Sequence, residues 1–222
     1  MERKFYCIFV AGGSGTRMGS DIPKQFLKLG GQTVLQRTIE RFIIAEPDLK
    51  IITVLPESHF DTWKEICSAG SLDIPQILVR GGVSRFHSVK NALEKVPDGV
   101  IVSIHDGVRP IVPVELIRAM RARMAECPAL IPVLPVVDTL RSKDPSVPSP
   151  DRSKVVAVQT PQMFHSEVIK DAYRLPYDTA FTDDASVAEA NKTPVSFMEG
   201  DRYNIKITTP EDLRCAELYL SL

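Results

Sequence analysis

The sequence has few cysteines and no cysteine cluster. Four cysteines are spread over 222 residues, and no two of them have the spacing of a metal-ligand pair: Cys7, Cys67, Cys127 and Cys215. This scarcity excludes a disulfide-stabilised scaffold and a zinc-ribbon type of site. We therefore expect reduced cysteines and a cytoplasmic location.

Long apolar runs and an excess of one charge are also missing. No run approaches the ~20 residues of a membrane-spanning helix, and the short apolar stretch 5–10 passes into glycines instead of a signal-peptide cleavage site. The 27 Lys and Arg residues balance 28 Asp and Glu residues, for a formal net charge of −1. Nonspecific nucleic-acid binding requires a basic face. We expect neither a membrane nor a nucleic-acid partner.

What the sequence does contain is an alternation of apolar, β-branched runs with segments of helical periodicity. The pattern predicts strands at 5–10, 51–55, 76–79, 100–104, 129–137 and 195–198. It predicts helices at 33–45, 84–96 and 114–124, and a last helix that Thr209 caps. Nearly all-apolar strands between helices indicate an α/β fold, a Rossmann-like three-layer sandwich with a mostly parallel, twisted sheet. Without a linker or repeat, 1–222 is expected to be one domain.

A glycine-rich turn follows the first predicted strand, and cations follow the turn. The residues concerned are Ala11, Gly12, Gly13, Ser14, Gly15, Arg17 and Lys24. Met18 occupies the position of the third glycine of a dinucleotide fingerprint, and the Gly-Lys pair of a Walker loop is absent. The turn by itself is compatible with an ordinary strand-to-helix connection. The two cations, with Pro23 fixing the chain before the second, favour a nucleotide phosphate loop.

The turn and the Pro-Lys-Gln-Phe string at 23–26 resemble the signature of nucleotidyltransferases that activate small phosphates. The Pro-Lys-Gln form is similar to cytidylyltransferases acting on 2-C-methyl-D-erythritol 4-phosphate or ribitol 5-phosphate. The strings His-Asp-x-x-Arg-Pro at 105–110 and Gln-Thr-Pro-Gln-x-Phe at 159–164 match the same family. The strings Arg-x-x-Ser at 85–88 and Thr-Asp-Asp-Ala-Ser-Val at 182–187 favour the methylerythritol branch.

The resemblance implies a role for each residue that matches a family motif. Arg17 and Lys24 would stabilise the charge that develops during transfer. The nucleotide would contact Ala11, Gly12, Gly13, Ser14, Gly15, Gly82, Arg85 and Ser88. The acceptor would be positioned by Asp106, Arg109, Thr139, Arg152, Thr160 and Lys206, the last on a short site strand. Val83 departs from the pattern, because many relatives carry an acid there.

The acidic residues near these motifs allow more than one interpretation. Asp106, at the end of a predicted strand, is either a helix cap or an ion-pair partner of Arg109, or it holds Mg²⁺, the expected cofactor, or a hydroxyl of the acceptor. Asp201 is a second candidate on the metal side. Asp183 and Asp184 need no metal, because helix capping by Thr182 and the helix dipole explain acids in a first turn.

The segment 138–158 has a different composition from the rest of the chain. Pro145, Pro148 and Pro150, with serines between them, cannot continue a helix or a central strand. The segment is either a flexible surface loop or a hairpin arm with prolines at its tip. In the resembling family such an arm crosses to a second subunit, which implies a homodimer in which Thr139 and Arg152 reach the partner's site.

The activity implied by the resemblance is attack of an acceptor phosphate on the α-phosphate of CTP. With 2-C-methyl-D-erythritol 4-phosphate the products are 4-diphosphocytidyl-2-C-methyl-D-erythritol and pyrophosphate, a step toward isoprenoid precursors. The same chemistry on ribitol 5-phosphate or another polyol phosphate is an alternative. A non-catalytic nucleotide-binding domain is an alternative of another class.

Overall fold

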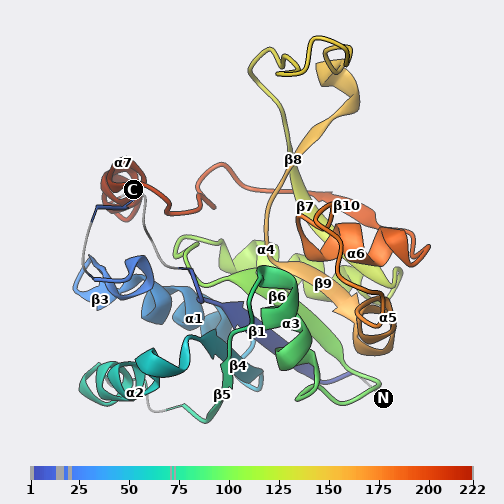
Figure 1. Cartoon of the computed structure of the whole chain (residues 1–222). Helices are drawn as coiled ribbons and strands as arrows, with labels where there is room; N and C mark the ends of the chain where they lie inside the picture. The colour runs from blue at the N-terminus through green and yellow to red at the C-terminus, as the bar shows by residue number, and fades with distance from the viewer. Residues whose placement is uncertain (1–2, 14–17, 20–21, 71, 73, 222) are drawn as a thin grey trace.

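The computed structural model describes residues 3–13, 18–19, 22–70, 72 and 74–221, and it contains a central eight-stranded sheet (Figure 1). The strands are β1 (Phe5–Val10), β4 (Lys50–Leu55), β5 (Gln76–Arg80), β6 (Ile101–Asp106), β7 (Ala129–Pro135), β8 (Val156–Val158), β9 (Gln162–His165) and β10 (Ser196–Glu199). Their order is β10-β7-β9-β6-β1-β4-β5, with β8 paired to β7. Strands β5, β4, β1 and β6 are parallel, β10 is parallel to β7, and β9 runs antiparallel between β6 and β7. The predicted mostly parallel sheet is confirmed.

Helices cover both faces of this sheet. One face carries α1 (Val34–Ala45), α2 (Phe60–Ala69) and α4 (Val114–Arg123), and the other carries α3 (Arg85–Leu93), α5 (Ser166–Ala172) and α6 (Asp184–Ala190). The last helix, α7 (Pro210–Tyr219), packs beside a small hairpin of β2 (Lys28–Leu29) and β3 (Gln32–Thr33). Short 3-10 turns are η2 (Lys24–Phe26), η3 (Glu57–His59) and η4 (Arg152–Lys154). The predicted three-layer sandwich is therefore confirmed.

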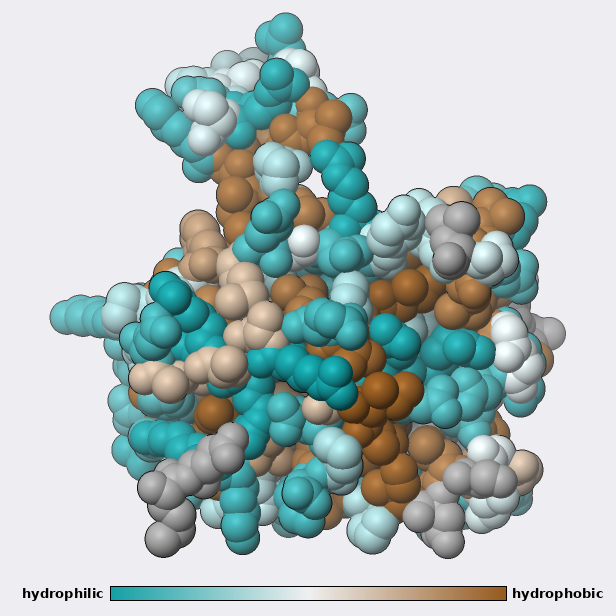
Figure 2. Space-filling view, turned by 180° about the vertical axis from the view of Figure 1, so that it is seen from behind, coloured by the Kyte–Doolittle hydropathy of each residue, from teal (hydrophilic) through white to brown (hydrophobic). Residues whose placement is uncertain are grey.

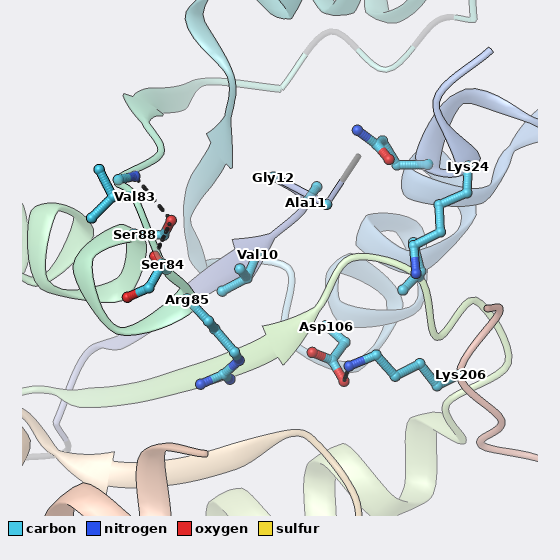
Figure 3. A pocket seen from close by; sticks show the side chains of 14 residues that line it. Val10, Ala11, Gly12, Lys24, Val83, Ser84, Arg85, Ser88, Asp106 and Lys206 are labelled. Carbon is cyan, nitrogen blue, oxygen red and sulfur yellow. Dashed lines mark hydrogen bonds and ion pairs between the residues drawn. The ribbon is translucent and has the colours of Figure 1, made fainter. Parts of the chain in front are cut away.

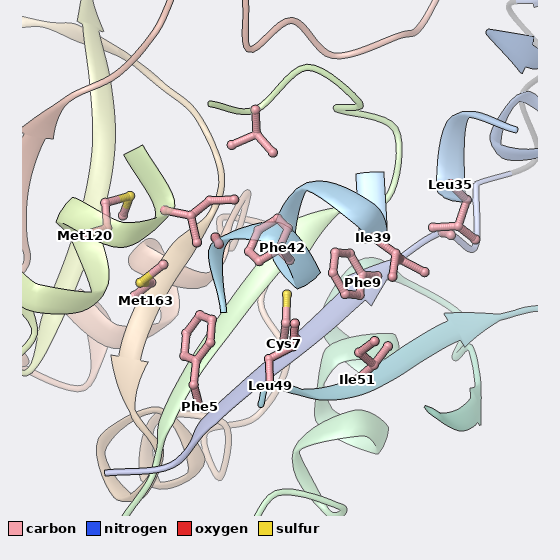
Figure 4. Packing of buried hydrophobic residues seen from close by; sticks show 14 of the residues in the cluster. Phe5, Cys7, Phe9, Leu35, Ile39, Phe42, Leu49, Ile51, Met120 and Met163 are labelled. Atoms are coloured by element: carbon pink, nitrogen blue, oxygen red, sulfur yellow. The ribbon is translucent and has the colours of Figure 1, made fainter. Parts of the chain in front are cut away.

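The alternation of side chains along β1 shows how the two cores arise. Phe5, Cys7 and Phe9 are buried against α1 and its neighbours, while Ile8 faces the opposite cluster under α3. Figure 4 shows Phe9 against Phe42 of α1, with ring centroids 5.1 Å apart in an edge-to-face arrangement. Because every other residue of a strand faces the same side, an all-apolar strand fills both cores at once.

Several helix starts follow from capping side chains. Thr33 caps α1 and Thr209 caps α7, each in a capping box, and Ser84 accepts a hydrogen bond from the backbone of His87 at the start of α3. The prediction of Thr182 as a cap is wrong. Asp183 caps α6, because its carboxylate accepts the Ser186 backbone N–H.

Other predicted boundaries also need correction. The helix predicted at 84–96 ends at Leu93, and the strand predicted at 129–137 ends at Pro135. The predicted site strand around Lys206 is wrong, since that residue lies in an irregular segment between β10 and α7. Helices α2 and α5 and strand β9 were not predicted.

The strands β7 and β8 continue into an arm that protrudes from the body, at the top of Figure 1. The two strands pair antiparallel through Val133 and Val158, and residues 136–155 form the distal part. The predicted protruding arm is therefore confirmed. Among the described residues, no helix is long and apolar enough to cross a membrane.

Candidate active site

A cavity of about 280 Å³ opens beyond the carboxyl ends of β1, β5 and β6 (Figure 3). This is the edge at which ligands bind in parallel α/β sheets. The predicted nucleotide residues that the structure describes all line it: Ala11, Gly12, Gly13, Gly82, Arg85 and Ser88. Lys24, Asp106 and Lys206 line the same cavity. Lys24 and Lys206, 182 positions apart in the sequence, are thus brought together.

A second depression, of about 250 Å³, adjoins the first. It contains three residues predicted to position the acceptor together with Lys206: Asp106, Arg109 and Thr160. Arg85, Asp106 and Lys206 line both cavities. The site therefore has two compartments with a common wall of one carboxylate and two cations, here called the shared wall.

Asp106 is the anion at the centre of the shared wall. Its Oδ2 accepts hydrogen bonds from Arg109 Nε at 3.0 Å and forms an ion pair with Lys206 Nζ at 3.2 Å. Burial by itself raises the pKa of this carboxyl group, but the charges of Lys206, Arg109 and Arg85 outweigh burial and hold the pKa well below its usual range. Asp106 is therefore ionised at neutral pH and fixes both cations.

Thr160 supports Asp106 from behind. Its hydroxyl accepts the Asp106 backbone N–H at 3.1 Å and lies 3.0 Å from Nδ1 of the buried His105. Burial lowers the pKa of His105 to about 3, so the ring is neutral at physiological pH. These contacts fix the end of β6, which is how Thr160 contributes to the site within this chain.

Lys24 lies along the glycine turn. Its ammonium group donates to the carbonyl of Ile207 at 3.1 Å, and a Cβ added at Gly13 would lie 3.8 Å from Lys24 Cε. The side chain thus runs past the backbone that would hold phosphates. This contact also ties η2 to the segment that carries Lys206.

Ser88 shapes the turn after β5. Its hydroxyl accepts the Gly82 backbone N–H at 3.0 Å and donates to the carbonyl of Ser84 at 2.9 Å. One lone pair therefore remains for a ligand. A Cβ on Gly82 would come within 2.4 Å of His87 Cβ, so only glycine fits there, while Val83 is 94% exposed at the rim.

Arg85 is held by a partner that sequence reasoning missed. Its guanidinium forms a two-pronged ion pair with the buried Asp184, with distances of 2.8 and 2.5 Å, and Tyr173 donates to the same carboxylate at 2.6 Å. Asp184 therefore holds the Arg85 guanidinium in place from inside the protein. The partners are 99 positions apart, and no local pattern pairs them.

Known proteins are similar to this chain over nearly its whole length. The family model described as 2-C-methyl-D-erythritol 4-phosphate cytidylyltransferase matches residues 5–222. The chain belongs to this family. A relative of that name from Bacteroides thetaiotaomicron is 47% identical, with 96% of this chain and 98% of the relative covered. One from Porphyromonas gingivalis is 46% identical, with both chains covered completely.

A solved structure supports the same assignment. The 4-diphosphocytidyl-2C-methyl-D-erythritol synthase of Anaerococcus prevotii is 28% identical, with a TM-score of 0.84 over 99% of both chains. The resemblance found in the motifs is thus confirmed, and the chain is a nucleotidyltransferase of the cytidylyltransferase family.

The two acids predicted as metal ligands, Asp106 and Asp201, make different contacts in the structure. Asp201 Oδ1 accepts the backbone N–H of Tyr203 at 2.6 Å and so closes a local turn. Among the residues that the structure describes, no cluster of three or more His, Cys, Asp or Glu side chains could hold a metal ion. Asp106 fits Mg²⁺, which is commonly bound by one or two carboxylates together with substrate phosphates. Arg109 and Lys206 both contact Oδ2 of this carboxylate.

The remaining predicted residues do not line these cavities or are not described. Ser14, Gly15 and Arg17 lie outside the described residues. Thr139 and Arg152 are exposed on the arm and line neither cavity, and Arg152 Nη1 donates to the carbonyl of Val137 at 2.7 Å. Their predicted action on a partner's site stays a prediction.

Proposed function

We propose that this chain transfers the cytidylyl group of CTP to 2-C-methyl-D-erythritol 4-phosphate, in the biosynthesis of isoprenoid precursors. The products are 4-diphosphocytidyl-2-C-methyl-D-erythritol and pyrophosphate. The observation that carries the proposal is the pair of adjoining cavities with their shared wall, in a chain of this family. CTP would occupy the cavity at the glycine turn, and the acceptor phosphate would occupy the one at Arg109 and Thr160.

The reaction needs positioned charge more than it needs a base. An oxygen of the acceptor phosphate attacks the α-phosphorus, and the bond from that phosphorus to the bridging oxygen breaks as pyrophosphate leaves. Because the second pKa of a phosphate is about 6, the nucleophile is already an anion at neutral pH. The barrier arises from repulsion between two anions and from charge growing on the leaving group.

The chain's own cations address both difficulties. Lys24 would stabilise charge on the nucleotide phosphates, and Lys206, which lines both cavities, would lower the repulsion as the acceptor approaches. Asp106 holds Lys206 and Arg109 in place. Mg²⁺, when bound to the phosphates and Asp106, would neutralise further negative charge.

The arm supports a proposal of a homodimer. Apolar side chains gather along it, above the body in Figure 2, and the exposed ones include Val137, Val147, Val156 and Val158. Exposed apolar groups on a protruding hairpin favour contact with another chain. Arg152 and Thr139 would then complete the acceptor cavity of the partner. Separately, we propose that the enzyme is cytoplasmic.

The test is an acceptor assay with the purified protein, Mg²⁺ and CTP. Pyrophosphate release is measured with 2-C-methyl-D-erythritol 4-phosphate and, separately, with ribitol 5-phosphate. We expect rapid release with the first acceptor only. Preference for ribitol 5-phosphate would overturn the acceptor, and CTP binding without turnover would overturn the activity.

A further inference from the structure

Gln25 is a buried glutamine that lines the first cavity, and the proposed reaction does not yet use it. The residue lies in η2 between Lys24 and Phe26 and is 1% exposed. Both amide atoms, Nε2 and Oε1, are buried, and within the described chain neither has a hydrogen-bond partner. An amide offers two donors and an acceptor with two lone pairs, so all of this capacity is unused.

The other buried glutamines show how unusual this is. Gln36 accepts from Thr33 and donates to the carbonyl of Ile66, and Gln159 and Gln162 are hydrogen-bonded through both amide atoms. Burying an amide without partners destabilises a protein, and nearly all buried polar groups are satisfied. A group that departs from this rule in a cavity calls for a partner from outside the chain.

The amide is held in place by its neighbours. Phe26 stacks on Trp63, with ring centroids 6.2 Å apart, and its backbone N–H donates to the carbonyl of Pro23 at 2.8 Å. On the other side Lys24 donates to Ile207. Because η2 is anchored on both sides, Gln25 cannot easily turn away to find solvent.

The surroundings of Gln25 indicate which part of a ligand it meets. Gln25 follows Lys24 in the chain, and the Lys24 side chain runs along Gly13 of the glycine turn, which lines the same cavity. The backbone of such a turn and the ammonium group of Lys24 are suited to phosphates. Ser88, in the first half of α3, lines the same cavity on the side away from Lys24 (Figure 3). An amide N–H is a good donor to a phosphate oxygen and adds no charge that would hold back a departing anion.

From this arrangement we infer that Gln25 binds the nucleotide, with Nε2 donating to an oxygen of the diphosphate that leaves. The inference rests on the proposed function and extends it by a residue for the leaving group. The ligand would satisfy the amide that the free protein leaves unpaired. The unpaired amide thus lowers the stability of the ligand-free protein and strengthens the binding of the ligand.

The test compares Gln25→Met with Gln36→Met. Methionine has nearly the same length as glutamine and no amide. We expect Gln25→Met to keep or raise the melting temperature of the ligand-free protein, because an unpaired buried amide is removed. We expect the same variant to raise the KM for CTP and the inhibition constant of inorganic pyrophosphate about tenfold, the effect of one lost hydrogen bond.

Two controls localise the effect. Gln36→Met should lower the melting temperature and leave the KM for CTP unchanged, since that amide is satisfied within the chain. The inhibition constant of CMP, which lacks the leaving diphosphate, should not change in Gln25→Met.

Contrary outcomes are equally clear. An unchanged pyrophosphate constant in Gln25→Met, or a lower melting temperature without a change in affinity, would overturn the inference. Equal weakening of CMP and pyrophosphate would overturn the assignment to the diphosphate. If the unaltered protein turns over no CTP, the proposed function fails, while calorimetry with CTP and pyrophosphate still decides the role of Gln25.

Discussion

Individual side chains set the charge of the two cavities. The shared wall has one ionised carboxylate, Asp106, beside Arg85 and Lys206. Arg109 adds a cation in the second cavity, and Lys24 adds one at the glycine turn. Such a surplus of positive charge suits two phosphate-bearing substrates. Removing one of these cations should therefore lower activity, and adding a methyl group to a glycine that lines the first cavity should affect either ligand binding or stability.

Lys24→Ala should abolish most activity without unfolding the protein. A positioned donor of this type is worth ~3–4 kcal/mol of barrier, so we expect kcat to fall by about 10²–10³. Steady-state pyrophosphate release and a thermal melt measure the two effects. Lys28→Ala, at the exposed residue of β2, is the matched control and should behave like the unaltered protein. A near-normal rate for Lys24→Ala would refute the proposed mechanism.

Gly12→Ala and Gly82→Ala should separate ligand space from protein space. A Cβ at Gly12 meets no atom within 4 Å, whereas one at Gly82 overlaps His87. We expect Gly12→Ala to melt normally and to bind CTP at least tenfold more weakly, because its methyl group occupies the phosphate position. Gly82→Ala should lose ~1–3 kcal/mol of stability. Calorimetry with CTP and thermal melts check both, and normal CTP binding by Gly12→Ala would contradict the assignment of the turn.

The secondary-structure elements bring these residues to one edge, and the end of β6 is the most constrained of them. His105 and Asp106 are adjacent there, one neutral and one ionised, and Thr160 contacts both. These internal contacts account for the presence of His105 at this position, without a role as a metal ligand or contact with solvent. Its burial has a consequence for acid stability.

Acid should destabilise the protein through His105. Its pKa of about 3 in the folded state lies below the unfolded value of about 6.5. Between these values only the unfolded chain binds the proton, so stability falls as pH drops from 6.5 toward 3, by up to ~1.4 kcal/mol per pH unit. Above pH 6.5 the group has no effect.

The comparison of the unaltered protein with His105→Gln isolates this contribution. Melting temperatures from pH 8 to pH 4 should fall less steeply below pH 6.5 in the variant, whatever its stability at pH 8. Parallel curves for the two proteins would show that another group is responsible.

The elements also show how far sequence reasoning reaches. β1 and β4 were predictable because strands buried on both faces are continuously apolar, and α1 because its apolar residues recur at helical spacing. β9 was not, since it has only four residues and begins with a glutamine that bonds to α6. Its antiparallel direction depends on pairing with β6 and β7, which no local pattern encodes.

The site was predictable to a similar degree. Motifs identified Lys24, Asp106 and Lys206, and the structure brings them to one cavity. Motifs could not pair Arg85 with Asp184, because that contact arises only when α3 and α6 pack on the same face. Nor could they show that the Gln25 amide lacks a partner, which is a property of packing.

At the scale of the whole molecule, the arm places two of the predicted acceptor residues outside the cavities of this chain. Arg152 and Thr139 extend away from the cavities of their own body. In a two-fold dimer each arm would serve the other subunit, since the same contacts occur twice. This arrangement can be tested by complementation.

Mixing Lys24→Ala with Arg152→Ala subunits should restore activity that neither variant has alone. In a mixed dimer one site carries both changes and the other carries neither, so random exchange should give about a quarter of normal activity. The mixture is refolded or co-expressed, and pyrophosphate release is measured. If each variant stays inactive in the mixture while mixed dimers form, Arg152 acts within its own chain or not at all.

The position of β9 affects the order in which the strands of the sheet can pair. β7 joins the main sheet through β9, which follows the arm in the sequence. A nascent chain that has left the ribosome only as far as β7 therefore does not yet contain a strand that pairs with β7. β1, β4, β5 and β6 can pair with one another before the arm is made, whereas β7 depends on the strand beyond the arm. A fragment ending at the arm would therefore lack the strand that joins β7 to β6.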